Sequence, residues 1–235
     1  MTACNGPGPL VPCNPSCGIG PTTHATHFSL APGRYWTVGL LPLGWARFID
    51  TPAATFADRW EVIGKDSVFA PLAPLLDIAA LGGRPDQTVA RMNAYLATLL
   101  ERPERDEDKI LRAHSALVDH EVTTVSEFAS HAGMTVRTLE RLSVAAFGFP
   151  PKLLMRRQRF LRSLSHFMLD PSLAWLATLD TQYVDQAHFI RDFKRFMDTT
   201  PRKYATQPHP VLWAASLAAT ATPRTPRCST RWRGW

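Results

Sequence analysis

The sequence contains no apolar run close to the roughly 18 residues that a membrane-spanning helix needs. Its first residues also lack the basic and apolar regions of a secretory signal, so we expect neither a membrane span nor export. Cysteine is scarce, and the four residues are Cys4, Cys13, Cys17 and Cys228. Because three lie in a leader rich in Gly and Pro and one in a tail, no disulfide framework is expected, which fits a reducing cytoplasm.

Charge is missing from the beginning of the chain and uneven in the rest. Residues 1–33 contain no Asp, Glu, Lys or Arg. Residues 34–130 carry 10 basic and 14 acidic residues, whereas residues 131–204 carry 12 basic and 6 acidic ones. An acidic middle joined to a basic C-terminal half is typical of a regulatory part joined to a nucleic-acid-binding part. The alternative interpretation is a solvated basic face.

The first 103 residues predict a leader followed by a small α+β domain. Residues 1–25, rich in Gly, Pro and Thr, have no periodicity and are expected to be disordered. Residues 26–30 and 35–41 resemble two strands that pair across a turn at residues 31–33. Helical patterns follow, with short pieces around 53–59 and 68–80 and a longer helix over 85–101. We therefore expect a small α+β regulatory domain over residues 26–103, in which Trp36 and Trp45 pack.

A helix-turn-helix pattern follows an amphipathic helix over residues 107–118. A capped short helix is predicted over 124–131, a tight turn over 133–135, and a second helix over 136–147. Thr135 is the expected N-cap of this second helix, because its hydroxyl can accept a hydrogen bond from an otherwise unpaired backbone N–H.

The pattern occurs a second time after a basic linker helix. Leu173, Leu176 and Leu179 mark a short helix, and residues 183–186 make the turn. A second helix is predicted over 185–197, with Phe189, Phe193 and Phe196 facing inward. The fold class is therefore mainly α: two helix-turn-helix units joined by a linker helix over residues 106–206, then a disordered tail over 207–235.

Two strings in this region resemble a known family. Residues 133–141 and 147–152, with residues 185–196 and 200–204, are similar to the DNA-binding domain of the AraC/XylS family of bacterial transcription regulators. The resemblance covers residues 107–206. More loosely, residues 26–103 resemble the later part of a regulator domain in which a reduced, cupin-like barrel precedes helices.

The resemblance implies sequence-specific binding to double-stranded DNA through the major groove by both units. It assigns base contacts to Arg137, Glu140, Arg141, Gln186, Ala187, His188 and Arg191. Arg can donate two hydrogen bonds to guanine, Gln can pair with adenine, and Glu can accept from cytosine, whereas Ala187 offers only an apolar contact. His188 could instead cap or pack.

Contacts to the DNA backbone would set affinity and salt dependence. The candidates are Thr135, Lys152, Arg156, Arg157, Lys194, Arg195 and Lys203. For Arg156, Arg157 and Arg159 the alternative is a solvated helix face.

One motif favours an enzyme. Cys13 and Cys17 resemble the first half of the four-cysteine zinc site of Ada-type alkylation-repair regulators, in which a zinc-bound thiolate accepts a methyl group from damaged DNA. Such a site needs a second cysteine pair in the same small domain, and none occurs before Cys228. Cys4 with His24 or His27 could complete it only in an unprecedented arrangement. We therefore expect no enzyme, no cofactor and no metal.

A third hypothesis is a protein-interaction or regulatory subunit with a degenerate DNA-binding domain. The favoured hypothesis is a cytoplasmic, nucleoid-associated transcription regulator. RNA polymerase and a second copy of the chain are compatible further partners, and no effector is identified.

Overall fold

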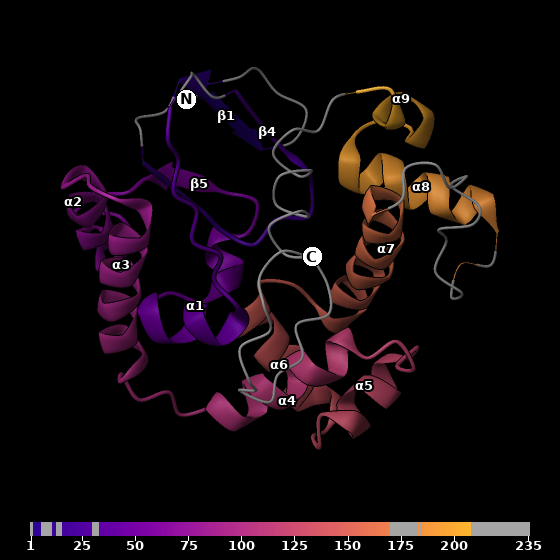
Figure 1. Cartoon of the computed structure of the whole chain (residues 1–235). Coiled ribbons are helices and arrows are strands. Elements are labelled where there is room, and N and C mark those ends of the chain that lie inside the picture. The colour runs from indigo at the N-terminus through magenta and orange to yellow at the C-terminus, as the bar shows by residue number, and fades with distance from the viewer. Residues whose placement is uncertain are drawn as a thin grey trace.

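Helices dominate the described part of the chain, and short strands gather near its N-terminus (Figure 1). The computed structural model describes residues 2–5, 11–12, 16–29, 33–169, 183 and 185–207. The mainly helical fold class, with a small α+β part ahead of the helix-turn-helix region, is confirmed. Among the helices of these residues, none is long and apolar enough to cross a membrane.

The described strands form two small antiparallel sheets. One has the order β2-β1-β4, with Thr2 opposite both Pro12 and Ser29. In the other, β3 pairs with β5 and places Gly18 opposite Glu61. The strands are β1 (Thr2–Asn5), β2 (Val11–Pro12), β3 (Cys17–Ile19), β4 (Thr26–Ser29) and β5 (Trp60–Val62).

Apart from α1 and α9, the described helices lie within the segments that the sequence predicts. Several begin with proline, whose fixed φ suits the first helical turn and whose missing N–H costs nothing there. The N-terminal helices are α1 (Pro42–Phe48), η1 (Ala53–Phe56), η2 (Ala70–Leu72), α2 (Pro74–Ala80) and α3 (Pro85–Leu100). The later ones are α4 (Glu107–Val118), α5 (Val125–His131), α6 (Val136–Leu142), the π-helical turn η3 (Ser143–Phe147), α7 (Pro151–Leu169), α8 (Gln186–Met197) and α9 (Pro201–Ala205).

An aromatic cluster forms the core of the N-terminal part. Phe69 meets Trp45 and Phe56 edge to face, with ring centroids 5.7 and 5.2 Å apart. The Trp45 indole also donates to the carbonyl oxygen of Thr51 at 2.7 Å. The prediction that Trp36 and Trp45 are packing residues is confirmed, because Trp45 is buried and Trp36 packs against the same cluster.

Residues 16–25 differ from the disordered leader that the sequence predicts. Cys17–Ile19 forms β3, and two glycines lie directly on the aromatic cluster. A Cβ atom at Gly18 would lie 2.2 Å from the Phe69 ring, and one at Gly20 would lie 2.0 Å from the Phe56 carbonyl oxygen. Glycine suggested a flexible segment, but here its missing side chain allows close packing. Strands β1 and β2 also fall within the leader.

The predicted hairpin of residues 26–30 and 35–41 is wrong. Thr26–Ser29 does form β4, but its partner is β1, and residues 35–41 form no strand. Trp36 and Leu40 pack instead against the helical core of this part. Helix α1 follows at Pro42, where the sequence predicted no helix. An alternating pattern shows that a segment is extended but does not identify its partner.

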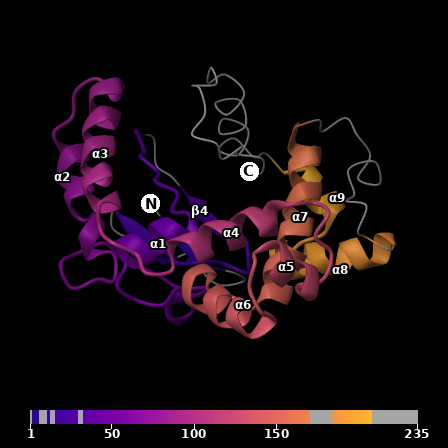
Figure 2. The same cartoon turned by 90° about the horizontal axis from the view of Figure 1, so that it is seen from below.

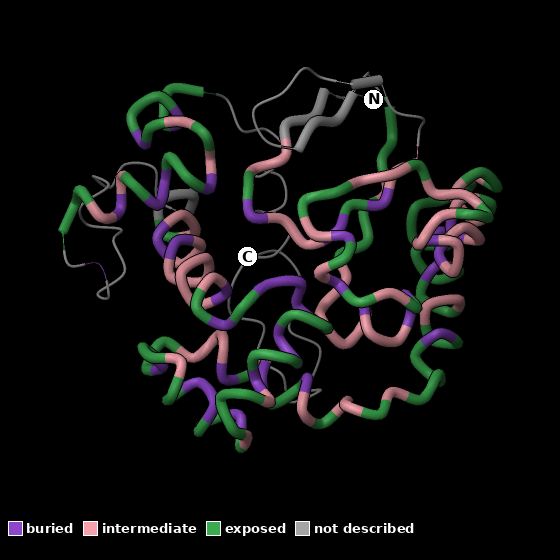
Figure 3. Tube along the Cα trace, turned by 180° about the vertical axis from the view of Figure 1, so that it is seen from behind, coloured by how far each residue is buried: buried purple, intermediate pink, exposed green. Residues whose placement is uncertain are grey.

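Helix α7 belongs to two hydrophobic cores of the C-terminal half. Leu154 is buried with residues of α4, α5 and α6, whereas Phe160 is buried with residues of α8 and α9. Leu153 packs against both cores. Figures 1 and 2 accordingly show α7 between the α4–α6 group and the α8–α9 pair. Buried residues lie where these helices face one another, and exposed residues lie outside (Figure 3).

Residues 20–25 connect the N-terminal part with the C-terminal half. Asp58 accepts hydrogen bonds from the backbone N–H and the hydroxyl of Thr23, at 2.5 and 2.8 Å. The N–H of Ala25 donates to the carbonyl oxygen of Phe196, at the end of α8, at 2.6 Å. Pro21 lies against Gly148, where a Cβ atom would come within 2.8 Å of the proline ring. This segment therefore contacts the end of η3 and the end of α8.

The close packing of Gly20 yields a prediction about stability. Gly20→Ala places a methyl group against a backbone oxygen, so we expect the free energy of unfolding to fall by about 1–3 kcal/mol. Gly39→Ala is the control, because nothing lies within 4 Å of a Cβ atom there. Urea unfolding followed by tryptophan fluorescence measures both, and equal effects would contradict the packing of residues 16–25.

Candidate nucleic-acid interface

The first helix-turn-helix unit is built as the sequence predicts. Thr124 and Glu127 form a capping box at the start of α5: the Thr124 hydroxyl accepts from the Glu127 N–H at 3.2 Å, and the Glu127 carboxylate accepts from the Thr124 N–H at 3.0 Å. Gly133 makes the turn with φ of 65°, a conformation that glycine adopts without strain. The predicted N-cap is confirmed, because the Thr135 hydroxyl accepts from the Thr138 N–H at 3.2 Å.

Helix α6 presents a polar face to solvent. Leu139 and Leu142 are buried in the core, while the three predicted base-contact residues Arg137, Glu140 and Arg141 are exposed. The helix continues directly into η3, so the predicted helical span of 136–147 is confirmed, with a π-helical last turn. The structure holds these side chains at a single exposed helix face, and their contacts with bases stay a prediction.

Helix α8 is the second exposed helix. Its N-cap Asp185 accepts from the His188 N–H at 2.6 Å. Phe189, Phe193 and Phe196 are buried, as predicted, with Phe160 and Tyr204. Of the predicted base-contact residues, Gln186, Ala187 and Arg191 are exposed and His188 is half-buried. The predicted first helix of this unit, at Leu173, Leu176 and Leu179, lies outside the described residues.

A buried carboxylate joins α8 to α7. Asp192 is 0% exposed, and its Oδ1 accepts from Nε of Arg156 at 2.5 Å. Its Oδ2 accepts from the Tyr183 hydroxyl at 3.1 Å and from Nη2 of Arg159 at 3.4 Å. The Arg159 guanidinium also lies 4.7 Å from the centroid of the Tyr183 ring. Three groups, two from α7 and one from the residue at position 183, therefore meet at one buried charge.

This cluster sets the protonation of Tyr183. Burial, together with the negative charge of Asp192, raises the pKa of Tyr183 well above its ordinary value. The hydroxyl therefore stays protonated and donates to the carboxylate. Asp192 itself was missed as a functional candidate. The signal was available, since Asp192 lies three residues after Phe189 and four before Phe196, on the apolar face of α8 where an unpaired charge is costly.

The predicted contacts to the DNA backbone divide into two groups. Thr135 and the exposed cations Lys152, Lys194, Arg195 and Lys203 face solvent. Arg156 is 32% exposed and paired with Asp192. Arg157 is partly buried: desolvation lowers its pKa, while the nearby Asp58 carboxylate acts in the opposite direction. Arg156 is thus engaged with a carboxylate of the protein, and Arg157 lies partly buried near another, so these two arginines do not form a free solvated face.

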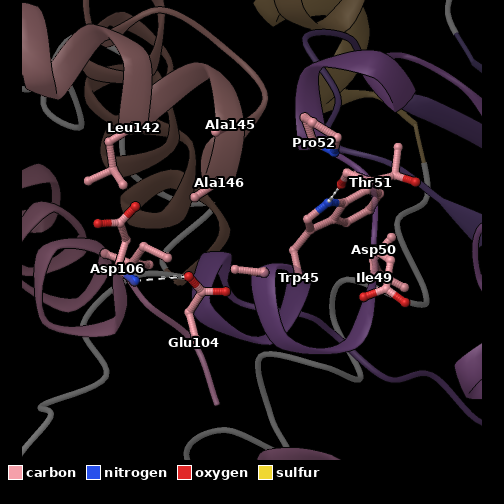
Figure 4. A pocket seen from close by; sticks show the side chains of 12 residues that line it. Trp45, Ile49, Asp50, Thr51, Pro52, Glu104, Asp106, Leu142, Ala145 and Ala146 are labelled. Carbon is pink, nitrogen blue, oxygen red and sulfur yellow. Dashed lines mark hydrogen bonds between the residues drawn. The ribbon is translucent and has the colours of Figure 1, made fainter. Parts of the chain in front are cut away.

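A shallow hollow of about 250 Å³ lies where α1 approaches the first helix-turn-helix unit. Figure 4 shows Trp45 and Asp50 on one side of the hollow and Leu142 and Ala146 on the other, with Glu104 and Asp106 below the latter two. The pKa of Asp106 is lowered, mainly by a hydrogen bond from Lys109. The hollow shows that the N-terminal part and α6 share a boundary.

The described residues hold no group of three or more His, Cys, Asp and Glu side chains arranged to bind a metal ion. Cys13, and the side chains of Cys4 and His27, lie outside the described residues, so the zinc hypothesis rests on the sequence argument alone.

Comparison with known proteins bears on the C-terminal part. Residues 128–207 match the family model of a helix-turn-helix domain. The match supports a DNA-binding domain of the AraC type over these residues. The match supports a DNA-binding transcription regulator and extends over α6, α7 and α8. No curated protein and no solved structure gives a significant match to the chain.

The N-cap of helix α6 can be tested separately. Thr135→Ala removes the hydroxyl that accepts from the Thr138 N–H, so we expect a loss of about 1 kcal/mol in the free energy of unfolding. Thr135→Ser keeps the hydroxyl and should stay within a few tenths of the wild type. Urea unfolding measures the difference, and identical losses in the two variants would show that the cap contributes nothing.

Proposed function

We propose that the chain is a sequence-specific transcription regulator that reads the major groove with both α6 and α8. The observation that carries this proposal is the pair of exposed polar helix faces held by one shared helix, α7, within an AraC-type domain. Since α7 packs in both cores, the two faces keep a defined separation. Two recognition helices one turn of B-DNA apart, about 34 Å, can enter successive major grooves.

Direct readout is assigned to side chains according to their hydrogen-bonding chemistry. On α6, Arg137 and Arg141 suit guanine, and Glu140 suits the amino group of cytosine. On α8, Gln186 suits adenine and Arg191 suits guanine, whereas Ala187 can contact a thymine methyl group. Each bidentate pair discriminates between bases by about 1–3 kcal/mol.

Phosphate contacts are assigned to the exposed groups. The first turn of α6 and Lys152 flank the first unit, and Lys194, Arg195 and Lys203 flank the second. Arg156 and Arg157 add to the positive potential of the linker, but the carboxylates of Asp192 and Asp58 offset their charge. Electrostatic affinity therefore depends more on the exposed lysines than on the linker arginines.

The N-terminal residues 26–103 are proposed as the regulatory part of a cytoplasmic, nucleoid-associated protein. Helix α1 packs beside α4 and η3, and Arg47 forms an ion pair with Glu107 at the start of α4. A conformational change in the N-terminal part would therefore alter the contacts of the first helix-turn-helix unit. RNA polymerase or a second copy of the chain could receive the signal.

Selection of bound sequences from a random DNA pool at physiological salt tests the function. We expect a bipartite site with half-sites about 10 base pairs apart, one for each unit. Arg137→Ala with Arg191→Ala should abolish specific retention, because each side chain supplies a bidentate contact. Arg91→Ala is the control, since it removes an exposed arginine from α3. Enrichment of no bipartite site would sink the proposal and favour a protein-interaction role.

Salt dependence tests the phosphate contacts. Lys194→Ala should weaken binding to all sequences alike and reduce the slope of log K against log[salt] by about one. Titration of the selected site at several salt concentrations measures this slope. A change in base preference without a change in slope would instead place Lys194 at a base edge.

A further inference from the structure

One predicted base-contact residue is held by the protein itself. Nη2 of Arg159, on α7, lies 3.2 Å from Nε2 of His188, on α8. The Arg159 side chain is 18% exposed, and Asp192 and the Tyr183 ring fix it in place. The His188 ring also meets the Tyr183 ring edge to face, with centroids 5.2 Å apart.

This contact determines which ring nitrogen of His188 carries the proton. A guanidinium has only donors, so Nε2 must accept, and the proton of the neutral imidazole lies on Nδ1. The hydrogen bond that Nε2 accepts thus makes Nδ1 the nitrogen that carries the proton. His188 then has one free polar atom, the Nδ1–H donor.

We propose that Asp192 and Arg159 are positioning residues that set the base specificity of His188. Asp192 anchors Arg159, and Arg159 holds His188 as an Nδ1–H donor in the first turn of α8. This rests on the proposed reading of DNA by α8. A donor at this point favours a base edge that offers acceptors, such as guanine N7 and O6, and disfavours the amino group of cytosine.

The alternative for Arg159 is a contact with phosphate, as considered for the linker helix. Its burial and its three partners argue against this, because a guanidinium must be accessible from outside the protein to contact a phosphate. Arg156 provides a matched comparison. It lies one turn earlier on α7 and pairs with the same carboxylate, but the hydrogen bond to His188 belongs to Arg159.

The first measurement is made on the full-length protein without DNA. Nitrogen-15 spectra of the imidazoles at mildly alkaline pH distinguish the two neutral tautomers. We expect His188 of the wild type and of Arg156→Met as the Nδ1–H tautomer. Arg159→Met should shift it towards Nε2–H, the form that free histidine favours. Each variant leaves one arginine on Asp192, and circular dichroism checks the fold.

The second measurement is sequence selection with the same proteins. His188→Ala identifies the base pair that His188 reads, as the position where preference disappears. Arg159→Met should lower discrimination at that position about tenfold and leave the other positions unchanged, while Arg156→Met should leave the base preference at every position unchanged, even though its lost charge weakens binding to all sequences alike. Equal effects of the two substitutions on base preference, or a uniform loss of affinity alone in Arg159→Met, would overturn the proposal.

The two measurements separate the two proposals. A wild-type spectrum with the Nε2–H tautomer overturns the positioning role whatever the DNA result, even if Arg159→Met does not fold. If the wild type enriches no DNA site, the proposed function fails and the base preference fails with it. The Nδ1–H tautomer would in that case still establish that Arg159 orients His188.

Discussion

The packing of α7 in two cores is the constraint on which the DNA-binding half depends. Leu154 and Phe160 lie six residues apart on one helix, yet each is buried in a different unit. Because an α-helix rises 1.5 Å per residue, the two cores are only about 9 Å apart along its axis. A loop of that length would leave the units free to rotate, whereas a helix buried at both points fixes their relative orientation.

The buried Asp192 adds a polar constraint to the apolar packing of α8 against α7. An apolar residue at this position would let α8 slide along α7 over a surface of phenylalanine side chains. A carboxylate with no exposed area must keep its partners, since breaking a buried ion pair costs several kcal/mol. Arg156 and Arg159 of α7 and the Tyr183 hydroxyl are the partners that it would lose if α8 shifted along α7. A buried ion pair is in itself weak evidence for stability, since well-packed apolar residues in its place are often as stable or more so.

The parts of the fold that could be predicted from the sequence are those that depend on local signals. The caps at Thr124 and Thr135 and the spacing of Phe189, Phe193 and Phe196 act within one or two turns, so the pattern alone predicts those helices. Partnership across the chain could not be predicted: residues 35–41 look like a strand but pack beside helices, and Gly20 lies against Phe56, 36 residues later. Asp192 was visible as a charge on an apolar face, but its arginine partners required the fold.

The distribution of charge acquires a different meaning once these contacts are known. The basic excess of residues 131–204 indicated a nucleic-acid-binding part, with a solvated basic face as the alternative. Part of this positive charge is neutralised within the protein, because Asp192 pairs with two linker arginines and Asp58 lies near a third. Exposed cations remain at the ends of the domain, around α6 and along α8 and α9. If the chain binds DNA as proposed, the linker supplies geometry and the two ends supply electrostatic attraction, so affinity and specificity depend on different residues.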